Sequence, residues 1–238
     1  MDRWSVYIDI EGFSATYALG SQPLVSIGAL MTGIYNIGSR CYRESPDRIF
    51  AHQLGDGFII VGEFGWPDLT QACSIAIALL RNVLVSGGAA KAAIAAGELA
   101  DVTGCYPPVI REAHGQAHGG AFSIGGGLMT VLPVMGTALI NAYRLLHADR
   151  TPSGPLLVVR RSDAPRLPQG VSSIEDHDLA VVDWLHASYD HLDRLLKEAA
   201  LLSPNPQQMK LAVQRYIAAN ALSGNWVANS RRYLRLGA

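Results

Sequence analysis

The stretch YIDIEGFSATY, residues 7–17, decides the fold, because it begins as an apolar β-strand and ends as a helix. Two acids, Asp9 and Glu11, stand at the join and are followed by Gly12 and Phe13. Only 16% of the residues are charged, so acids at the end of a predicted core strand point to a special role. Glycine beside a strand end lets a backbone or a phosphate approach closely.

A second acid has the same setting further along the chain. RIFAHQL and GFIIVGEF predict two strands joined at Gly55-Asp56-Gly57, which is a strong hairpin signal. If this hairpin lies beside the strand of Asp9, the carboxylates of Asp9 and Asp56 converge. Two carboxylates and a backbone carbonyl suit hard divalent cations, and two such ions about 3.5–4 Å apart can clamp an in-line phosphoryl displacement. A turn or cap remains the alternative for each acid alone.

The rest of the pattern mixes helices and strands without strict alternation. Residues 89–99 are ambiguous between helix and strand, and their place between two turn-like segments favours a strand. Residues 103–127 are expected to be a loop. The other predicted strands are 128–135 and 154–161, and the predicted helices are 14–40 (broken near 20–23), 68–86, 136–148, 179–202 and 206–224. This order predicts an α+β fold, with helices packed mainly on one face of a sheet and a C-terminal helical extension. We expect two parts, residues 1–162 and 163–238.

Bulk composition excludes several classes of protein. The formal net charge is −1, so no global field attracts nucleic acid. No apolar run reaches the ~18 residues that a membrane span needs, and the first residues do not read as a signal peptide. Cys41, Cys73 and Cys105 form neither a disulfide framework nor a zinc spacing. We therefore expect a cytoplasmic protein with reduced thiols.

Four segments together resemble the class III nucleotidyl cyclases. YIDIEGFSATY is similar to their first catalytic motif and LGDGFIIV to their second, the Gly-Asp-Gly hairpin. AAIAAGELADVTGCY and VLPVMGTALINAYRLLHA resemble, more loosely, a later strand and the final helix of that family. The resemblance covers roughly residues 4–150. It implies an α+β sheet and a head-to-tail homodimer with its sites at the interface. It also implies conversion of a nucleoside triphosphate into a 3′,5′-cyclic monophosphate and pyrophosphate.

The resemblance also implies roles for individual residues. Asp9 and Asp56, helped by the Ile10 carbonyl, would hold two Mg²⁺ or Mn²⁺ ions per site. The backbone N–H groups around residues 12–14, which are Gly12, Phe13 and Ser14, would bind phosphates at the start of a helix.

The final helix departs from the family pattern. Arg144 would stabilise transition-state charge. One turn before it the family has an asparagine, where this chain has Ile140, and Asn141 stands one position away. Asn141 and Arg144 share a helix face with Thr137, so Asn141 is a candidate replacement, while ordinary polar helix surface is the alternative.

Base selectivity is expected to depend on the strand before Asp56. Purine cyclases of the family usually carry a lysine there, whereas RIFAHQLGD has none and places Phe50 and His52 on one face. A narrow pocket favours a pyrimidine, UTP before CTP. Simple packing of these two side chains is the alternative.

The stand-alone architecture also resembles the pyrimidine cyclases of the Pycsar anti-phage systems. That resemblance implies a cyclic UMP or cyclic CMP signal, antiviral defence, and a separate effector that responds to the cyclic nucleotide. The competing hypothesis is a catalytically silent homologue that acts as a nucleotide-binding or regulatory partner.

Overall fold

The computed structural model describes residues 2–13, 22–43, 49–62, 68–116 and 121–237. Its centre is a seven-stranded, mainly antiparallel sheet in the order β10-β11-β9-β4-β1-β3-β2. The strands of this sheet are β1 (Asp2–Ile10), β2 (Ile49–Leu54), β3 (Gly57–Gly62), β4 (Ala90–Glu98), β9 (Leu157–Arg160), β10 (Ser173–Asp176) and β11 (Leu179–Val182). The predicted α+β class is confirmed, and residues 89–99 resolve as a strand.

Strand β1 lies in the middle of the sheet and is paired on both edges. It runs antiparallel to β3 on one side and to β4 on the other. Residues 4–8 are all buried, and Ile8 is completely so. A strand that is hydrogen-bonded on both edges and covered on both faces must be apolar on both faces, which explains why the acids appear only where β1 ends.

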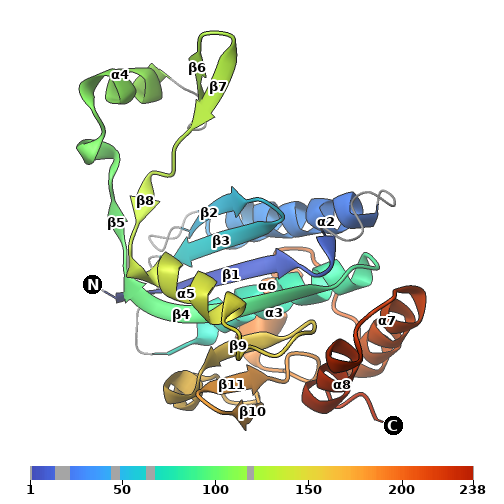
Figure 1. Ribbon diagram of the computed structural model, residues 1–238. Coiled ribbons are helices and arrows are strands. Elements are labelled where there is room, and N and C mark those ends of the chain that lie inside the picture. The colour runs from blue at the N-terminus through green and yellow to red at the C-terminus, as the bar shows by residue number, and fades with distance from the viewer. Residues whose placement is uncertain (1, 14–21, 44–48, 63–67, 117–120, 238) are drawn as a thin grey trace.

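Helices cover both faces of the sheet (Figure 1). On one side lie α2 (Gln22–Asn36), continued by a π-helical turn (Ile37–Cys41), together with α3 (Thr70–Val85) and α6 (Asp190–Glu198). Helix α3 is buried on nearly every side, as expected of a helix that is apolar all round. Helix α5 (Thr137–His147) packs on β4 and β1 across the opposite face. The predicted helix start at residues 14–21 lies outside the described residues.

Residues 99–116 and 121–136 form an arm that projects away from the sheet (Figure 1). The arm contains β5 (Ala100–Asp101), a 3₁₀ turn (Thr103–Cys105), α4 (Pro108–Gln116), β6 (Ala121–Ile124), β7 (Gly127–Thr130) and β8 (Val134–Met135). The expectation of a loop over 103–127 was therefore wrong, and so was that of one strand over 128–135. The glycines and prolines that suggested a loop connect short elements instead: Gly125-Gly126 is the β6–β7 turn, and Pro108 begins α4.

The C-terminal part contains strands as well as helices. A 3₁₀ segment (Arg161–Arg166) leads to β10 and β11, which extend the same sheet past residue 162. The helix predicted over 179–202 was wrong for its first half, because LAVV is a buried strand and only Asp190–Glu198 is helical. A short apolar run does not distinguish the two structures. Helices α7 (Pro206–Ala219) and α8 (Gly224–Tyr233) follow. The division into two parts at residue 162 stays a prediction.

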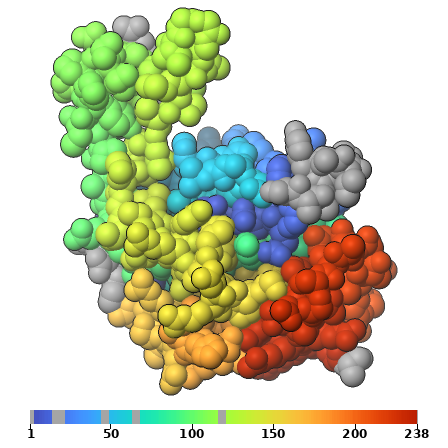
Figure 2. Space-filling view, in the orientation of Figure 1, coloured from blue at the N-terminus to red at the C-terminus, as the bar shows by residue number. Residues whose placement is uncertain are grey.

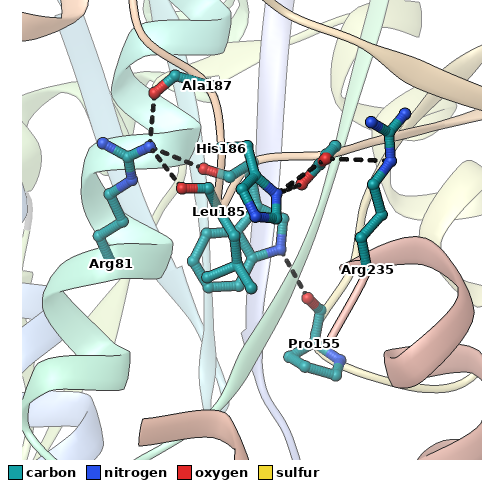
Figure 3. Close-up of polar contacts among 8 residues, drawn as sticks. Arg81, Pro155, Leu185, His186, Ala187 and Arg235 are labelled. Atoms are coloured by element: carbon teal, nitrogen blue, oxygen red, sulfur yellow. Dashed lines mark hydrogen bonds and ion pairs between the residues drawn. The ribbon is translucent and has the colours of Figure 1, made fainter. Parts of the chain in front are cut away.

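Arg81, a buried residue of α3, connects this helix to the turn that follows β11 (Figure 3). Its Nη2 donates to the carbonyl oxygens of Trp184 at 2.9 Å, Leu185 at 3.2 Å and Ala187 at 2.7 Å. Burial lowers the pKa of Arg81. The neighbouring Trp184 Nε1 donates to the Pro155 carbonyl at 2.7 Å, so one cluster joins α3, the entry to β9 and the chain after β11.

Within the described residues, no helix combines the length and apolar character needed to cross a membrane.

Replacing Arg81 with methionine tests this cluster. The change keeps the apolar stem but leaves three buried carbonyls without their donor, so we expect a loss of about 2–4 kcal/mol in the free energy of unfolding. Urea denaturation measures the loss, and Arg111→Met on the exposed arm is the matched control. Equal stabilities of the two variants would contradict the assignment.

Candidate functional site

The end of β1 brings two carboxylates together. Asp9 is the register partner of Gly57, the first residue of β3, and Asp56 stands immediately before it in the hairpin turn. Burial and the negative charge of Asp56 raise the pKa of Asp9 from 3.8 to about 6. The convergence expected from the sequence is therefore present within one chain.

The close approach depends on the missing side chain of Gly57. A Cβ atom at this position would lie 2.8 Å from the Ile8 carbonyl oxygen and 2.9 Å from the Asp9 Oδ1. Both distances are shorter than a carbon atom tolerates. The second glycine of the hairpin thus makes the space in which the Asp9 carboxylate lies.

The backbone supplies a third oxygen in the same direction. The Glu11 N–H donates to the Ala89 carbonyl, 2.9 Å away on the β4 side of β1. Because the C=O and N–H of a trans peptide point in opposite directions, the Ile10 carbonyl points to the β3 side, where Asp56 lies. Asp9, Asp56 and the Ile10 carbonyl therefore form a set of oxygen donors.

Basic and aromatic side chains that the sequence reasoning missed surround this acid pair. His147 Nε2 lies 3.8 Å from Asp9 Oδ2, and Lys91 is the register partner of Asp9 in β4. Both basic side chains act to lower the pKa of Asp9, against burial and Asp56. The His147 ring stacks on Tyr143, with a centroid distance of 4.3 Å, and Tyr7 meets both rings edge-on.

Simple periodicity could have found part of this cluster. Tyr7 precedes Asp9 by two residues and so lies on the same face of β1. Tyr143 and His147 are four residues apart on one helix face. The contribution of Lys91 depends on the register of β1 with β4, which no local pattern gives.

The chemistry of the donors fits a hard cation in part. Carboxylate and carbonyl oxygens are the ligands that Mg²⁺ and Mn²⁺ prefer. Over the described ranges, no group of three or more His, Cys, Asp or Glu side chains gathers closely enough to hold a metal ion. An ion held by Asp9, Asp56 and the Ile10 carbonyl would need water or substrate oxygens to complete its shell.

The segment after the acids turns sharply. Gly12 has a φ of +72°, in the left-handed region that favours glycine. Phe13 packs partly buried against the core. Ser14, the third residue expected to contact phosphates, lies outside the described residues.

Phe50 and His52 line one cavity of about 440 Å³. Its other walls come from β3, from the arm, which contributes His114 and residues 130–134, and from Leu139 of α5. Neither Asp9 nor Asp56 is among the described residues that line it. Phe50 and His52 therefore share a cavity whose described lining does not include the acid pair, and its use as a base pocket stays a prediction.

Asn141 and Arg144 line cavities whose described walls do not include Asp9 or Asp56. Both line a second cavity, of about 850 Å³, whose walls include Arg160, Arg161 and Glu175. Asn141 Nδ2 donates to the Ala96 carbonyl at 2.9 Å, which fastens α5 to β4. The Arg144 side chain is exposed, and Ile140 beside it is 47% exposed. Arg144 also lines a smaller cavity with Leu54 and Tyr143, and among the described residues it forms no ion pair with Asp9 or Asp56.

Comparison with known proteins gives structural neighbours only. No model of a protein family matches the sequence, and a search of curated proteins finds no relative. The fold is similar to that of a class III adenylyl cyclase-like ATP-binding protein from Pseudomonas aeruginosa, with a TM-score of 0.41 and 13% identity, over 82% of this chain and 40% of that one. It is also similar to a bacterial light-regulated adenylyl cyclase, with a TM-score of 0.40 and 9% identity, over 91% and 57% of the two chains. This chain spans about half the length of these neighbours.

The raised pKa of Asp9 predicts how the metal-free protein responds to pH. Because the folded pKa exceeds the ordinary value, protonation of Asp9 stabilises the fold below pH 3.8, and this contribution is lost as the pH rises through about 6. Asp9→Asn keeps the neutral form at every pH. In EDTA at pH 8 we expect Asp9→Asn to exceed the wild type by about 1–3 kcal/mol in urea unfolding, and to match it near pH 4. A pH-independent difference would contradict this.

The space at Gly57 predicts a second effect. Gly57→Ala places a methyl group against the Ile8 carbonyl and the Asp9 carboxylate, so we expect a loss of about 1–3 kcal/mol in stability and weaker Mn²⁺ binding. Urea unfolding and Mn²⁺ titration followed by electron paramagnetic resonance measure the two effects. Gly126→Ala is the control, because an added Cβ there meets nothing within 4 Å. Unchanged Mn²⁺ affinity in Gly57→Ala would refute the placement.

Proposed function

We propose that this protein is a nucleotide cyclase that converts a nucleoside triphosphate into a 3′,5′-cyclic monophosphate and pyrophosphate. The observation that carries the proposal is the convergence of Asp9 and Asp56 beside the Ile10 carbonyl, at a strand end followed by a glycine turn. The ribose 3′-oxygen attacks the α-phosphorus, the bond to the β-phosphate breaks, and one proton is released.

The acid pair would hold Mg²⁺ or Mn²⁺, two ions per site. When bound, such ions favour ionisation of the 3′-hydroxyl and screen the triphosphate. Asp9 and Asp56 supply the negative charge that retains the ions, and the rigid pairing of β1 with β3 and β4 fixes where they lie. The backbone near Gly12 and Phe13 would receive the phosphates.

The site would be completed by a second copy of the chain. Arg144 is exposed and lines a cavity separate from the acids of its own chain, as expected if it acts on the acid pair of a partner in a homodimer. There its guanidinium would stabilise negative charge in the transition state. Asn141 Nδ2 already donates to the Ala96 carbonyl. We therefore propose that Asn141 orients α5 and that its side-chain oxygen is available to substrate.

Phe50 and His52 are the proposed readers of the base. They line the cavity of about 440 Å³ between β2 and the arm, where Phe50 offers a stacking surface and His52 a hydrogen bond. We propose UTP as the preferred substrate, then CTP. The cyclic pyrimidine nucleotide would signal to a separate effector in anti-phage defence.

A catalytically silent homologue is the second candidate, and one observation favours it. Lys91 and His147 already place basic groups beside Asp9, which partly balances the acids without a bound ion. Such a protein would bind nucleotide, or a partner, and turn nothing over.

A turnover panel separates the two candidates. The purified protein is incubated with ATP, GTP, CTP or UTP and Mn²⁺, and the products are read by mass spectrometry. We expect cyclic UMP, then cyclic CMP, with at least a hundredfold loss of product in Asp56→Asn because a metal-holding charge is gone. Asp149→Asn, an exposed acid just after α5, is the matched control. A purine product would reject the base assignment alone, and no product from a folded dimer would favour the silent homologue.

The shared site is tested by mixing two inactive variants. Asp56→Ala lacks one acid of the pair and Arg144→Ala lacks the arginine, so a mixed dimer retains one intact site. Product should return to about a quarter of the wild-type rate for equal amounts and free exchange of subunits, because half of the dimers are mixed and each has one of two sites. If subunits exchange and no product returns, the two residues do not share a site across the interface.

A further inference from the structure

Glu11, two residues after Asp9, has all of its polar groups engaged. Its N–H donates to Ala89, and its Oε1 lies 3.5 Å from Lys91 Nζ. Its Oε2 accepts a hydrogen bond of 2.6 Å from Trp226 Nε1, and its carbonyl oxygen accepts one of 3.3 Å from the Tyr216 hydroxyl. Each polar group of Glu11 therefore already has a partner within the chain.

Two of these contacts come from the C-terminal helices. Tyr216 belongs to α7 and Trp226 to α8, 205 and 215 residues away in sequence. Figure 2 shows these helices, in red, against the N-terminal strand, in blue. The Glu11 side chain is only 11% exposed, so its bond to the indole is charge-assisted and shielded from water. Burial and Glu11 raise the pKa of the Tyr216 hydroxyl, which keeps it a proton donor.

The far end of α8 is fixed to the sheet. Tyr233 donates to Asp176 Oδ2 of β10 at 2.8 Å, and Asn229 donates to the Ser153 carbonyl at 3.0 Å. Just after the helix, Arg235 Nε lies 3.4 Å from the buried Asp183, which also contacts His186 (Figure 3). Helix α8 therefore connects the β10–β11 edge of the sheet to Glu11, two residues after Asp9.

The contacts of Trp226 and Tyr216 with Glu11 also affect the acid pair, because Glu11 shares a peptide plane with Ile10. The peptide that carries the Glu11 N–H also carries the Ile10 carbonyl, so a movement of Glu11 that breaks its N–H bond to Ala89 also turns this oxygen away from the β3 side. The next residue, Gly12, is in the left-handed region, and a Cβ on it would lie 3.8 Å from the Tyr216 hydroxyl. The turn that leads the chain toward Phe13 therefore lies next to Tyr216.

We propose that Trp226 and Tyr216 are positioning residues. By holding Glu11, the C-terminal helices fix the Ile10 carbonyl and the Gly12 turn in the geometry that the acid pair and the phosphates require. The role of these residues in metal and phosphate binding rests on the proposed function. Their contacts with Glu11 do not depend on whether the protein turns over a nucleotide.

The test uses the double variant Trp226→Phe, Tyr216→Phe in the full chain. It keeps both rings and removes only the two donors. Trp184→Phe with Tyr189→Phe is the matched control, because it removes an indole bond to Pro155 and a hydroxyl that accepts from Ser74, both away from the site. Glu11→Gln should reproduce part of the effect, since it weakens the Trp226 bond and removes the ion pair with Lys91 but keeps the backbone bond to Tyr216.

The first readout is amide hydrogen exchange of residues 8–13 without nucleotide. We expect the Glu11 N–H to exchange about tenfold faster in the site variant, the size expected for loss of a hydrogen bond to a charged group, and at the wild-type rate in the control. Unchanged exchange in the site variant would overturn the proposal, whether or not the protein makes a cyclic nucleotide.

The second readout is Mn²⁺ affinity by electron paramagnetic resonance, with the kinetic constants beside it. We expect about tenfold weaker Mn²⁺ binding and a similar fall in kcat, with KM nearly constant, in the site variant only. A merely structural role would affect the site variant and the control alike, and that result would also overturn the proposal. If the wild type binds no Mn²⁺, the proposed function fails. The exchange result alone then decides whether Trp226 and Tyr216 hold Glu11 in place.

Discussion

The pairing of β1 with strands on both of its edges is the constraint on which the rest of the molecule depends. Antiparallel ladders to β3 and β4 fix the register of all nine residues, and a slip by one residue would turn every side chain to the opposite face. That register places Asp9 opposite both Gly57 and Lys91. The acid pair, its glycine space and its nearest lysine are therefore consequences of one alignment.

The groups around Asp9 shift its pKa in opposite directions, and the net effect is a raised pKa. Asp56 and burial oppose the charge of Asp9, while Lys91 and His147 support it. Folding alone would favour fewer acids at a half-buried strand end. A protein that keeps them there accepts a cost in stability, which is common where binding or chemistry requires the charge.

Local patterns in the sequence predicted the elements that carry the acids, and missed the contacts that hold them. The hairpin at Gly55-Asp56-Gly57 and the strand of Asp9 have short-range signals, and both were correct. The strand LAVV was mistaken for helix because four buried apolar residues shortly before an amphipathic helix look like its first turn. Lys91 and Trp226 could not be connected with residues 9–11, because register and tertiary packing, rather than local propensity, bring them there.

The distance along the chain between Glu11 and Trp226 has a consequence for synthesis. The contact spans 215 residues, and closing so long a loop is slow and late in folding. During translation β1 emerges first, yet the helices that hold its end emerge only after every strand of the sheet. The acid pair would thus acquire its final geometry as one of the last events in folding, so a nascent chain would carry the acids long before it could use them.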